Sequence, residues 1–138
     1  MSYYQADLKK VVKTPNPSLK ILLVEDDPVY AELIEDLLKS VGETEFQLTT
    51  VDRLGEAIKW VQKVGYDLML LDLSLPDSEG LDTIVSAKAQ APNVPIVVLT
   101  ALNDRKVAIE AVRKGAQDYL IKGRFQRDLL IHSIRYAI

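Results

Sequence analysis

The sequence of 138 residues is 48% hydrophobic and 27% charged, a composition typical of one soluble globular domain and not of a disordered chain. Its 17 Lys and Arg against 20 Asp and Glu give a net charge of −3, which offers nucleic acid no general attraction. The absence of cysteine excludes a disulfide framework or a thiolate metal site. No apolar run is long enough to span a bilayer, and residues 1–20 lack the apolar region of a signal peptide, so we expect a cytoplasmic location.

Residues 1–18 are predicted to form a flexible N-terminal tail, because Pro15 and Pro17 oppose regular structure. We expect the folded domain at residues 19–138. It begins with an apolar strand at residues 19–24, after which Asp27 and Pro28 are typical of a helix N-cap and first helical position. This first helix, with apolar residues at helical spacing, is predicted to run to Val41 and to end before Gly42.

The rest of the chain repeats this alternation of strand and helix. Further strands are predicted at residues 46–51, 66–72, 96–100 and 118–122, and further helices at residues 54–64, 80–91, 104–114 and 125–138. Asp52 is the expected N-cap of the second helix, and Asn103 or Asp104 that of the fourth. The last helix reaches Ile138 without a Gly or Asn stop, which predicts that the natural chain continues.

Five strand–helix units with short connections predict an α/β fold with a parallel sheet, because each crossover must be right-handed and places its helix on a face of the sheet. A barrel would need eight such units. We therefore expect a flavodoxin-like, doubly wound, five-stranded parallel sheet, (βα)5, with strand order 2-1-3-4-5.

The strand at residues 66–72 is a nearly unbroken apolar run that ends in Asp72, with Pro76 four residues later. Such a run is typical of a strand buried on both faces of a parallel sheet. Open α/β sheets bind their ligands beyond the carboxyl ends of their strands. Asp72 is therefore the leading candidate for a functional residue.

Other predicted strands bring related side chains to the same edge: Glu25 and Asp26 follow the first strand, and Thr100 and Lys122 end the fourth and fifth. Carboxylates a few ångströms apart repel by roughly 4 kcal/mol at an effective dielectric constant of about 20, so the cluster requires a cation or raised pKa values. Mg²⁺ suits a few carboxylates together with water and a phosphate oxygen. Lys122 and Thr100 add donors that fit a phosphoryl group on Asp72.

Short motifs stand at these strand ends in a fixed order. They are ILLVEDDP ending at Pro28, Asp72 followed by Pro76 and Gly80, VVLTA around Thr100, and GAQDYLIK ending at Lys122. With them, residues 20–138 resemble the receiver domain of bacterial two-component response regulators, of the chemotaxis-regulator type.

The resemblance implies a role for each matching residue. Asp72 would accept a phosphoryl group from the phosphohistidine of a sensor histidine kinase or phosphotransfer protein. Asp26 and Asp72 would bind Mg²⁺ directly, Glu25 through water, and Ser74 through its backbone carbonyl. Lys122 would pair with the phosphoryl oxygens.

The resemblance also implies a switch. Thr100 would move to bond the phosphoryl group, Tyr119 would turn inward, and the surface of the fourth helix, fifth strand and fifth helix would change partners. The protein would then signal by binding and not by turnover, with homodimerisation on phosphorylation as a further expectation. It would lack direct contact with nucleic acid or membrane and would belong to a longer signalling protein, whose kinase and output the sequence does not name.

One position departs from the family pattern, in which proline usually follows the lysine of the fifth strand. Here Gly123 follows Lys122. A cis peptide bond before a non-proline residue costs about 3 kcal/mol, so we expect glycine to supply the unusual backbone angles itself.

Two other functions stay open. A magnesium-dependent phosphohydrolase with an aspartyl-phosphate intermediate would need a second acid two residues after its nucleophile, where this chain has Ser74. A receiver-like interaction module that is never phosphorylated would not need the full acidic and basic set. Structural interpretations of single residues also remain: Thr100 as a strand-end residue, Lys122 as a solvated lysine and Tyr119 as a packing aromatic.

Overall fold

The fold is built on a parallel sheet in which two adjacent strands are buried along their whole length. The computed structural model describes residues 18–39 and 46–138. Its strands are β1 (Leu19–Val24), β2 (Phe46–Val51), β3 (Leu68–Asp72), β6 (Ile96–Thr100) and β7 (Asp118–Ile121), with a separate two-stranded hairpin of β4 (Ser74–Leu75) and β5 (Ser78–Glu79). The five strands pair in parallel in the order β2-β1-β3-β6-β7. The predicted flavodoxin-like fold and its 2-1-3-4-5 order are confirmed.

Two predicted features lie outside the described residues. They are the N-terminal tail, except for Ser18, and the end of the first helix at Val41 with its Gly42 stop. Elsewhere the predicted boundaries shift by a few residues: β3 begins at Leu68 and β7 ends at Ile121, so Lys122 is the first residue of the following loop.

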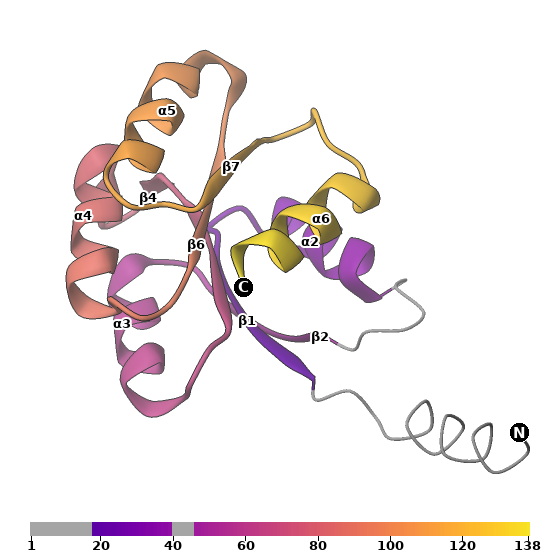
Figure 1. Ribbon diagram of the computed structural model, residues 1–138, viewed down its shortest axis with the longest axis horizontal. Coiled ribbons are helices and arrows are strands. Elements are labelled where there is room, and N and C mark those ends of the chain that lie inside the picture. The colour runs from indigo at the N-terminus through magenta and orange to yellow at the C-terminus, as the bar shows by residue number, and fades with distance from the viewer. Residues whose placement is uncertain (1–17, 40–45) are drawn as a thin grey trace, which may run out of the picture.

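Helices cover both faces of the sheet (Figure 1). They are α2 (Pro28–Lys39), α3 (Leu54–Lys63), α4 (Leu81–Gln90), α5 (Arg105–Arg113) and α6 (Arg127–Ala137). Figure 1 shows α3, α4 and α5 on one side of the sheet and α2 with α6 on the other. Successive side chains of β3 point to opposite faces, so Met69 and Leu71 pack in one core while Leu68 and Leu70 pack in the other. Each such side chain contributes about 1.5–3 kcal/mol, which is why β3 carries no polar residue before Asp72.

The helix caps match the prediction in part. Asp27 caps α2 as predicted, because its Oδ1 accepts the N–H of Val29 at 3.0 Å. The expectation that Asp52 caps α3 is wrong: Asp77, in the turn between β4 and β5, accepts the N–H groups of Leu54 and Gly55 at 2.8 and 2.9 Å. The β4–β5 hairpin is thereby tied to the start of α3.

Asp104 occupies the N-cap position of α5, one of the two residues predicted for it, but its side chain makes no capping hydrogen bond. Leu102–Asp104 form a short 3-10 helix, η1, that leads directly into α5, and neither Asn103 nor Asp104 makes a side-chain cap. In this turn the backbone N–H of Asp104 donates to the Ala101 carbonyl at 3.0 Å.

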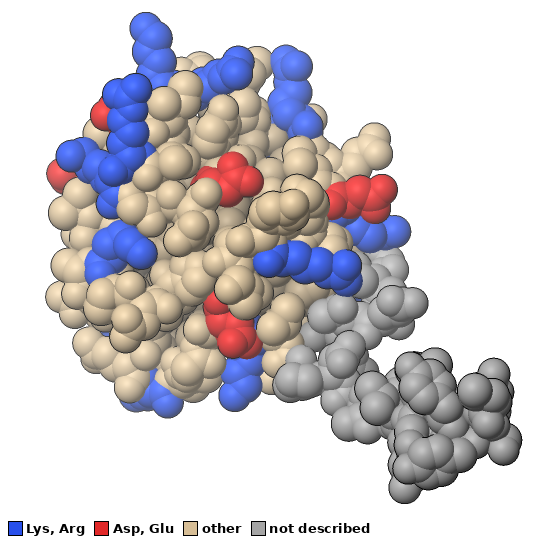
Figure 2. Space-filling view, in the orientation of Figure 1, with Lys and Arg blue, Asp and Glu red and all other residues tan. Residues whose placement is uncertain are grey.

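The charged side chains are spread over the surface. On the face in Figure 2, Lys and Arg stand at several places around the rim, including the upper left over α5 and α4, and Asp and Glu lie among uncharged residues nearer the centre. Within residues 18–39 and 46–138, no helix is long and apolar enough to cross a membrane.

Candidate functional site: an acidic cavity at the carboxyl ends of the strands

The carboxyl edge of the sheet holds an open cavity of about 510 Å³. Parallel pairing brings the ends of β1, β3 and β6 together, with the loop after β7 beside them. Six of the seven predicted site residues line this cavity: Glu25, Asp26, Asp72, Ser74, Thr100 and Lys122. Residues far apart in the sequence therefore meet where the strand pattern predicts.

Asp72 is held at the centre of the cavity by a donor on each carboxylate oxygen. Its Oδ1 accepts the backbone N–H of Ser74 at 3.0 Å, and its Oδ2 accepts from the Lys122 ammonium at 2.8 Å. Only 5% of the residue is exposed. A carboxylate this buried is fixed in one orientation, with solvent reaching it only through the cavity.

Glu25, Asp26 and Asp72 form a cluster in which one carboxylate oxygen from each residue lies within 4.8 Å of the others. Burial, together with its hydrogen bond to Asp72, raises the pKa of Glu25 to about 7, although Lys122 opposes this shift. Asp26 is exposed, on the open side of the cluster. Three carboxylates at this spacing, one of them open to solvent, are a donor set that fits a divalent ion such as Mg²⁺.

Lys122 is not a solvated lysine. Its ammonium pairs with both Asp72 and Glu25, and its side chain is only 24% exposed. Burial alone would lower its pKa, but the two carboxylates outweigh burial and raise the pKa above the ordinary value. The structural interpretation of Lys122 as a surface residue is therefore wrong.

The backbone turns sharply at Gly123, where φ is +78°. No cis peptide bond occurs within the described residues. Glycine adopts this left-handed conformation at little cost, so the prediction that Gly123 supplies the unusual angles is confirmed.

Thr100 and Tyr119 occupy different surroundings. Thr100 ends β6, is 3% exposed and lines the cavity. Tyr119, half-buried on β7, packs against the core beneath α3, α4 and α5 and does not line the cavity. Only Thr100 is thus placed to meet a group bound at Asp72 directly.

Two neighbours of the site carry no obvious sequence signal. Glu79 lines the cavity, and its Oε1 accepts the hydroxyl of Ser74 at 3.0 Å. Tyr30, in the first turn of α2, places its ring 4.8 Å from the Lys122 ammonium. The Tyr30 contact joins segments that are distant in the sequence, and the hairpin that carries Glu79 is too short to show a pattern.

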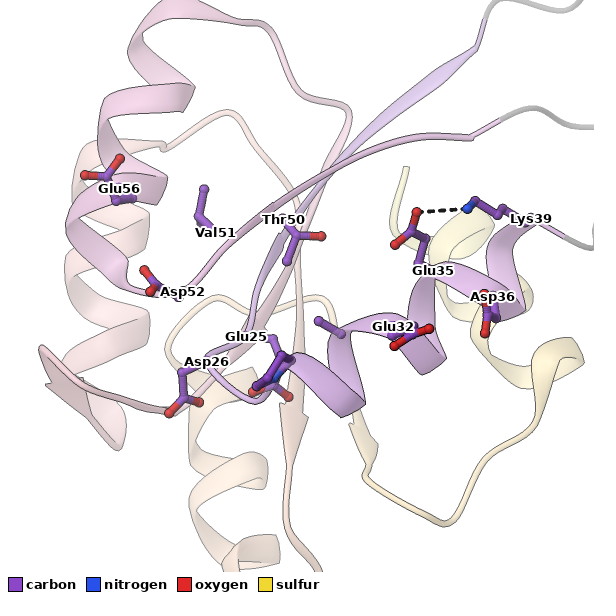
Figure 3. Close-up of a pocket in the computed structure, with 12 residues that line it drawn as sticks. Glu25, Asp26, Glu32, Glu35, Asp36, Lys39, Thr50, Val51, Asp52 and Glu56 are labelled. Carbon is purple, nitrogen blue, oxygen red and sulfur yellow. Dashed lines mark ion pairs between the residues drawn. The ribbon is translucent and has the colours of Figure 1, made fainter.

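A second hollow of about 760 Å³ opens beside the cavity, between α2, the edge strand β2 and α3 (Figure 3). Glu25 and Asp26 lie at one end of it, and Lys39 pairs with Glu35 at 3.0 Å on the far side. Its other acidic residues are Glu32, Asp36, Asp52 and Glu56. This concentration of negative charge produces a field that attracts cations toward Asp26.

Comparison with known sequences gives the family. The sequence profile of the response regulator receiver domain matches residues 21–135. The chain belongs to this family. The receiver domain is 34% identical over 120 residues to the cell cycle transcriptional regulator CtrA of Caulobacter vibrioides, and 27% identical over 120 residues to the chemotaxis protein CheY of Listeria monocytogenes. The match to CtrA covers 87% of this chain and half of CtrA. The match to CheY covers 86% of this chain and 98% of CheY.

Solved structures agree with this assignment. The receiver domain of the sensor histidine kinase PA1611 from Pseudomonas aeruginosa is 33% identical, with a TM-score of 0.73 over 87% of this chain and 97% of that one. That structure has a magnesium ion coordinated in its active-site cleft.

Proposed function

We propose that this receiver domain is a phosphoacceptor switch in which Asp72 takes a phosphoryl group from the phosphohistidine of a histidine kinase or phosphotransfer protein. The observation that carries the proposal is the double restraint on Asp72, by Lys122 and by the Ser74 N–H, beside two further carboxylates. Such a carboxylate is oriented for attack while its charge is balanced.

Asp26 and Asp72 would hold Mg²⁺ directly, Glu25 would do so through water, and the Ser74 carbonyl would complete the protein ligands. When bound, the ion would neutralise charge on the phosphoryl oxygens and on the carboxylates. The PA1611 receiver domain, with magnesium in its cleft, supports this choice of ion.

In the reaction, an oxygen of Asp72 forms the new bond to phosphorus as the bond from phosphorus to the imidazole nitrogen breaks, and that electron pair stays on the imidazole. Lys122 is positioned to leave its pairing with Asp72 and to bind a phosphoryl oxygen. Phosphoryl transfer needs positioning and charge balance more than covalent help, and these residues supply both.

The switch would begin at Thr100, whose hydroxyl lines the cavity and can bond a phosphoryl oxygen. Tyr119 would follow by turning inward on β7, changing the surface of α5, β7 and α6 for an output partner or a second copy. We place the domain at residues 19–138 of a longer cytoplasmic signalling protein that acts by binding and not by turnover.

The test is to incubate the protein with Mg²⁺ and acetyl phosphate and to measure the intact mass. Wild type and Asp128→Asn, a control on exposed α6, should gain one phosphoryl group, and Asp72→Asn should gain none. Absence of an adduct in wild type despite bound Mg²⁺ would favour a module that is never phosphorylated. Steady hydrolysis of other phosphoesters would favour a phosphohydrolase.

A further inference from the structure

Lys122 has a third neighbour that carries no charge. The Tyr30 ring lies 4.8 Å from the Lys122 ammonium, within the range in which a cation is attracted to an aromatic face. Tyr30 comes from α2 and Lys122 from the loop after β7, so the contact joins two segments that lie far apart in the sequence. The ring is half-buried against the core between the sheet and α2 with α6.

The loop that carries Lys122 turns immediately after this lysine. Burial raises the pKa of Tyr30, and the Lys122 charge and then the Gly123 backbone oppose that rise. Gly123 is the left-handed corner that redirects the chain immediately after Lys122. The Tyr30 ring therefore lies beside the functional lysine, and the next residue of the chain is the turn that sets the direction of this lysine.

Tyr30 is itself fixed at its backbone. Its position in the first turn of α2 is held by Asp27, whose Oδ1 caps the helix through the Val29 N–H. The backbone N–H of Asp27 in turn donates to the Glu25 carboxylate at 3.3 Å. The segment that carries the ring is thus hydrogen-bonded to the acidic cluster.

We propose that Tyr30 is a positioning residue for Lys122, holding the ammonium at the mouth of the cavity while its charged partners change. This inference rests on the proposed function. Glu25 and Asp72 alter their charge and their partners when a cation and a phosphoryl group arrive, but the ring takes part in neither step. Its attraction for Lys122 persists throughout, so the lysine stays within reach of the phosphoryl oxygens.

The experiment compares Tyr30→Leu, which removes the ring, with Tyr30→Phe, which keeps it. Tyr136→Leu is the control, since Tyr136 is 81% exposed on α6. A cation–π contact is worth about 0.5–2 kcal/mol, so we expect Tyr30→Leu to slow phosphorylation by acetyl phosphate about 2- to 30-fold. Tyr30→Phe should stay closer to wild type than Tyr30→Leu, and the Mg²⁺ dissociation constant should be unchanged in all variants.

A second measurement is independent of phosphorylation. The ring current of Tyr30 should shift the NMR resonances of the Lys122 side chain in wild type and Tyr30→Phe, and this shift should vanish in Tyr30→Leu. If wild type accepts no phosphoryl group, the proposed function fails and these NMR signals alone decide whether Tyr30 positions the lysine.

Three results would overturn the inference. They are an unchanged Lys122 resonance in Tyr30→Leu, a phosphorylation rate equal to that of wild type, or a loss of rate matched by an equal loss of Mg²⁺ affinity. The last result would indicate a general distortion of the acidic cluster.

Discussion

The Lys122 ammonium lies 2.8 Å from Oδ2 of Asp72, and it also pairs with Glu25. A single cation therefore balances two carboxylates that are almost completely buried. This relationship links the stability of the domain to the site, because any change in the lysine leaves buried negative charge without compensation.

Replacing Lys122 by methionine should destabilise the protein in the absence of divalent ions. Unpaired buried carboxylates are costly, but Lys122 is partly exposed, so we expect a loss of about 2 kcal/mol in the free energy of unfolding. Urea denaturation in EDTA measures it, and added Mg²⁺ should restore part of the loss. Lys59→Met, which breaks only an exposed pair with Glu56, should change stability by less than about 0.5 kcal/mol. Equal effects of the two substitutions would contradict the buried-charge explanation.

Asp77 should stabilise the protein more than Asp52 does. Asp77→Ala removes the acceptor of two α3 amides and should cost about 1–2 kcal/mol. Asp52→Ala loses only an exposed pair with Arg53 and should be nearly neutral. Thermal denaturation of both variants ranks them, and the reverse order would show that the capping assignment is incorrect.

The Asp77 cap should also depend on pH. Burial opposes ionisation of Asp77, but the Gly55 and Leu54 amides outweigh it and lower its pKa below the ordinary value of 3.8. A carboxylate with a lowered folded pKa contributes stability above the unfolded pKa and loses it as pH falls through the folded pKa. The stability difference between wild type and Asp77→Ala should therefore be constant near neutral pH and shrink below about pH 4.

Gly123→Ala should destabilise the turn after Lys122. An added Cβ meets open space there, so the cost comes only from the left-handed backbone at φ +78° and should be about 1–2 kcal/mol. Gly65 also has open space around it but no positive φ, so Gly65→Ala is the matched control and should not destabilise. The comparison is made by chemical denaturation. Similar losses at both positions would mean that backbone conformation is not the cause.

Thr100→Ala should separate phosphorylation from switching. The variant keeps Asp72, Lys122 and the acidic cluster, so it should still gain the phosphoryl mass, but it loses the hydroxyl that lines the cavity. Backbone NMR shifts over α5, β7 and α6 should therefore change less on phosphorylation than in wild type. Thr100→Ser should restore the NMR shift changes of wild type. Shift changes as large as those of wild type in Thr100→Ala would show that the Thr100 hydroxyl has no part in the switch.

The sequence predicts the sheet and the position of Asp72 because burial on both faces removes polar residues from β3 until the strand ends. Since parallel strands end at one edge, the meeting of Glu25, Thr100 and Lys122 with Asp72 follows from the strand order alone. These features depend on patterns that are local in the sequence.

Contacts between distant segments could not be predicted in the same way. Asp77 caps a helix that begins 23 residues earlier, while Asp52, with the better local position, points to Arg53. The contact of Tyr30 with Lys122 depends on how α2 packs beside the loop after β7, which no local pattern encodes. The sequence therefore predicts the acidic cluster better than the contacts around it, such as the Asp77 cap and the packing of Tyr30 against Lys122.

The most direct test is to locate the phosphoryl group. Borohydride reduces an aspartyl phosphate to homoserine, so peptide mass mapping of the phosphorylated and reduced protein identifies the modified residue. The account predicts homoserine at position 72, dependent on Mg²⁺ and absent from untreated protein. Homoserine in place of another aspartate would contradict this prediction. So would a protein that carries a phosphoryl group but yields no homoserine.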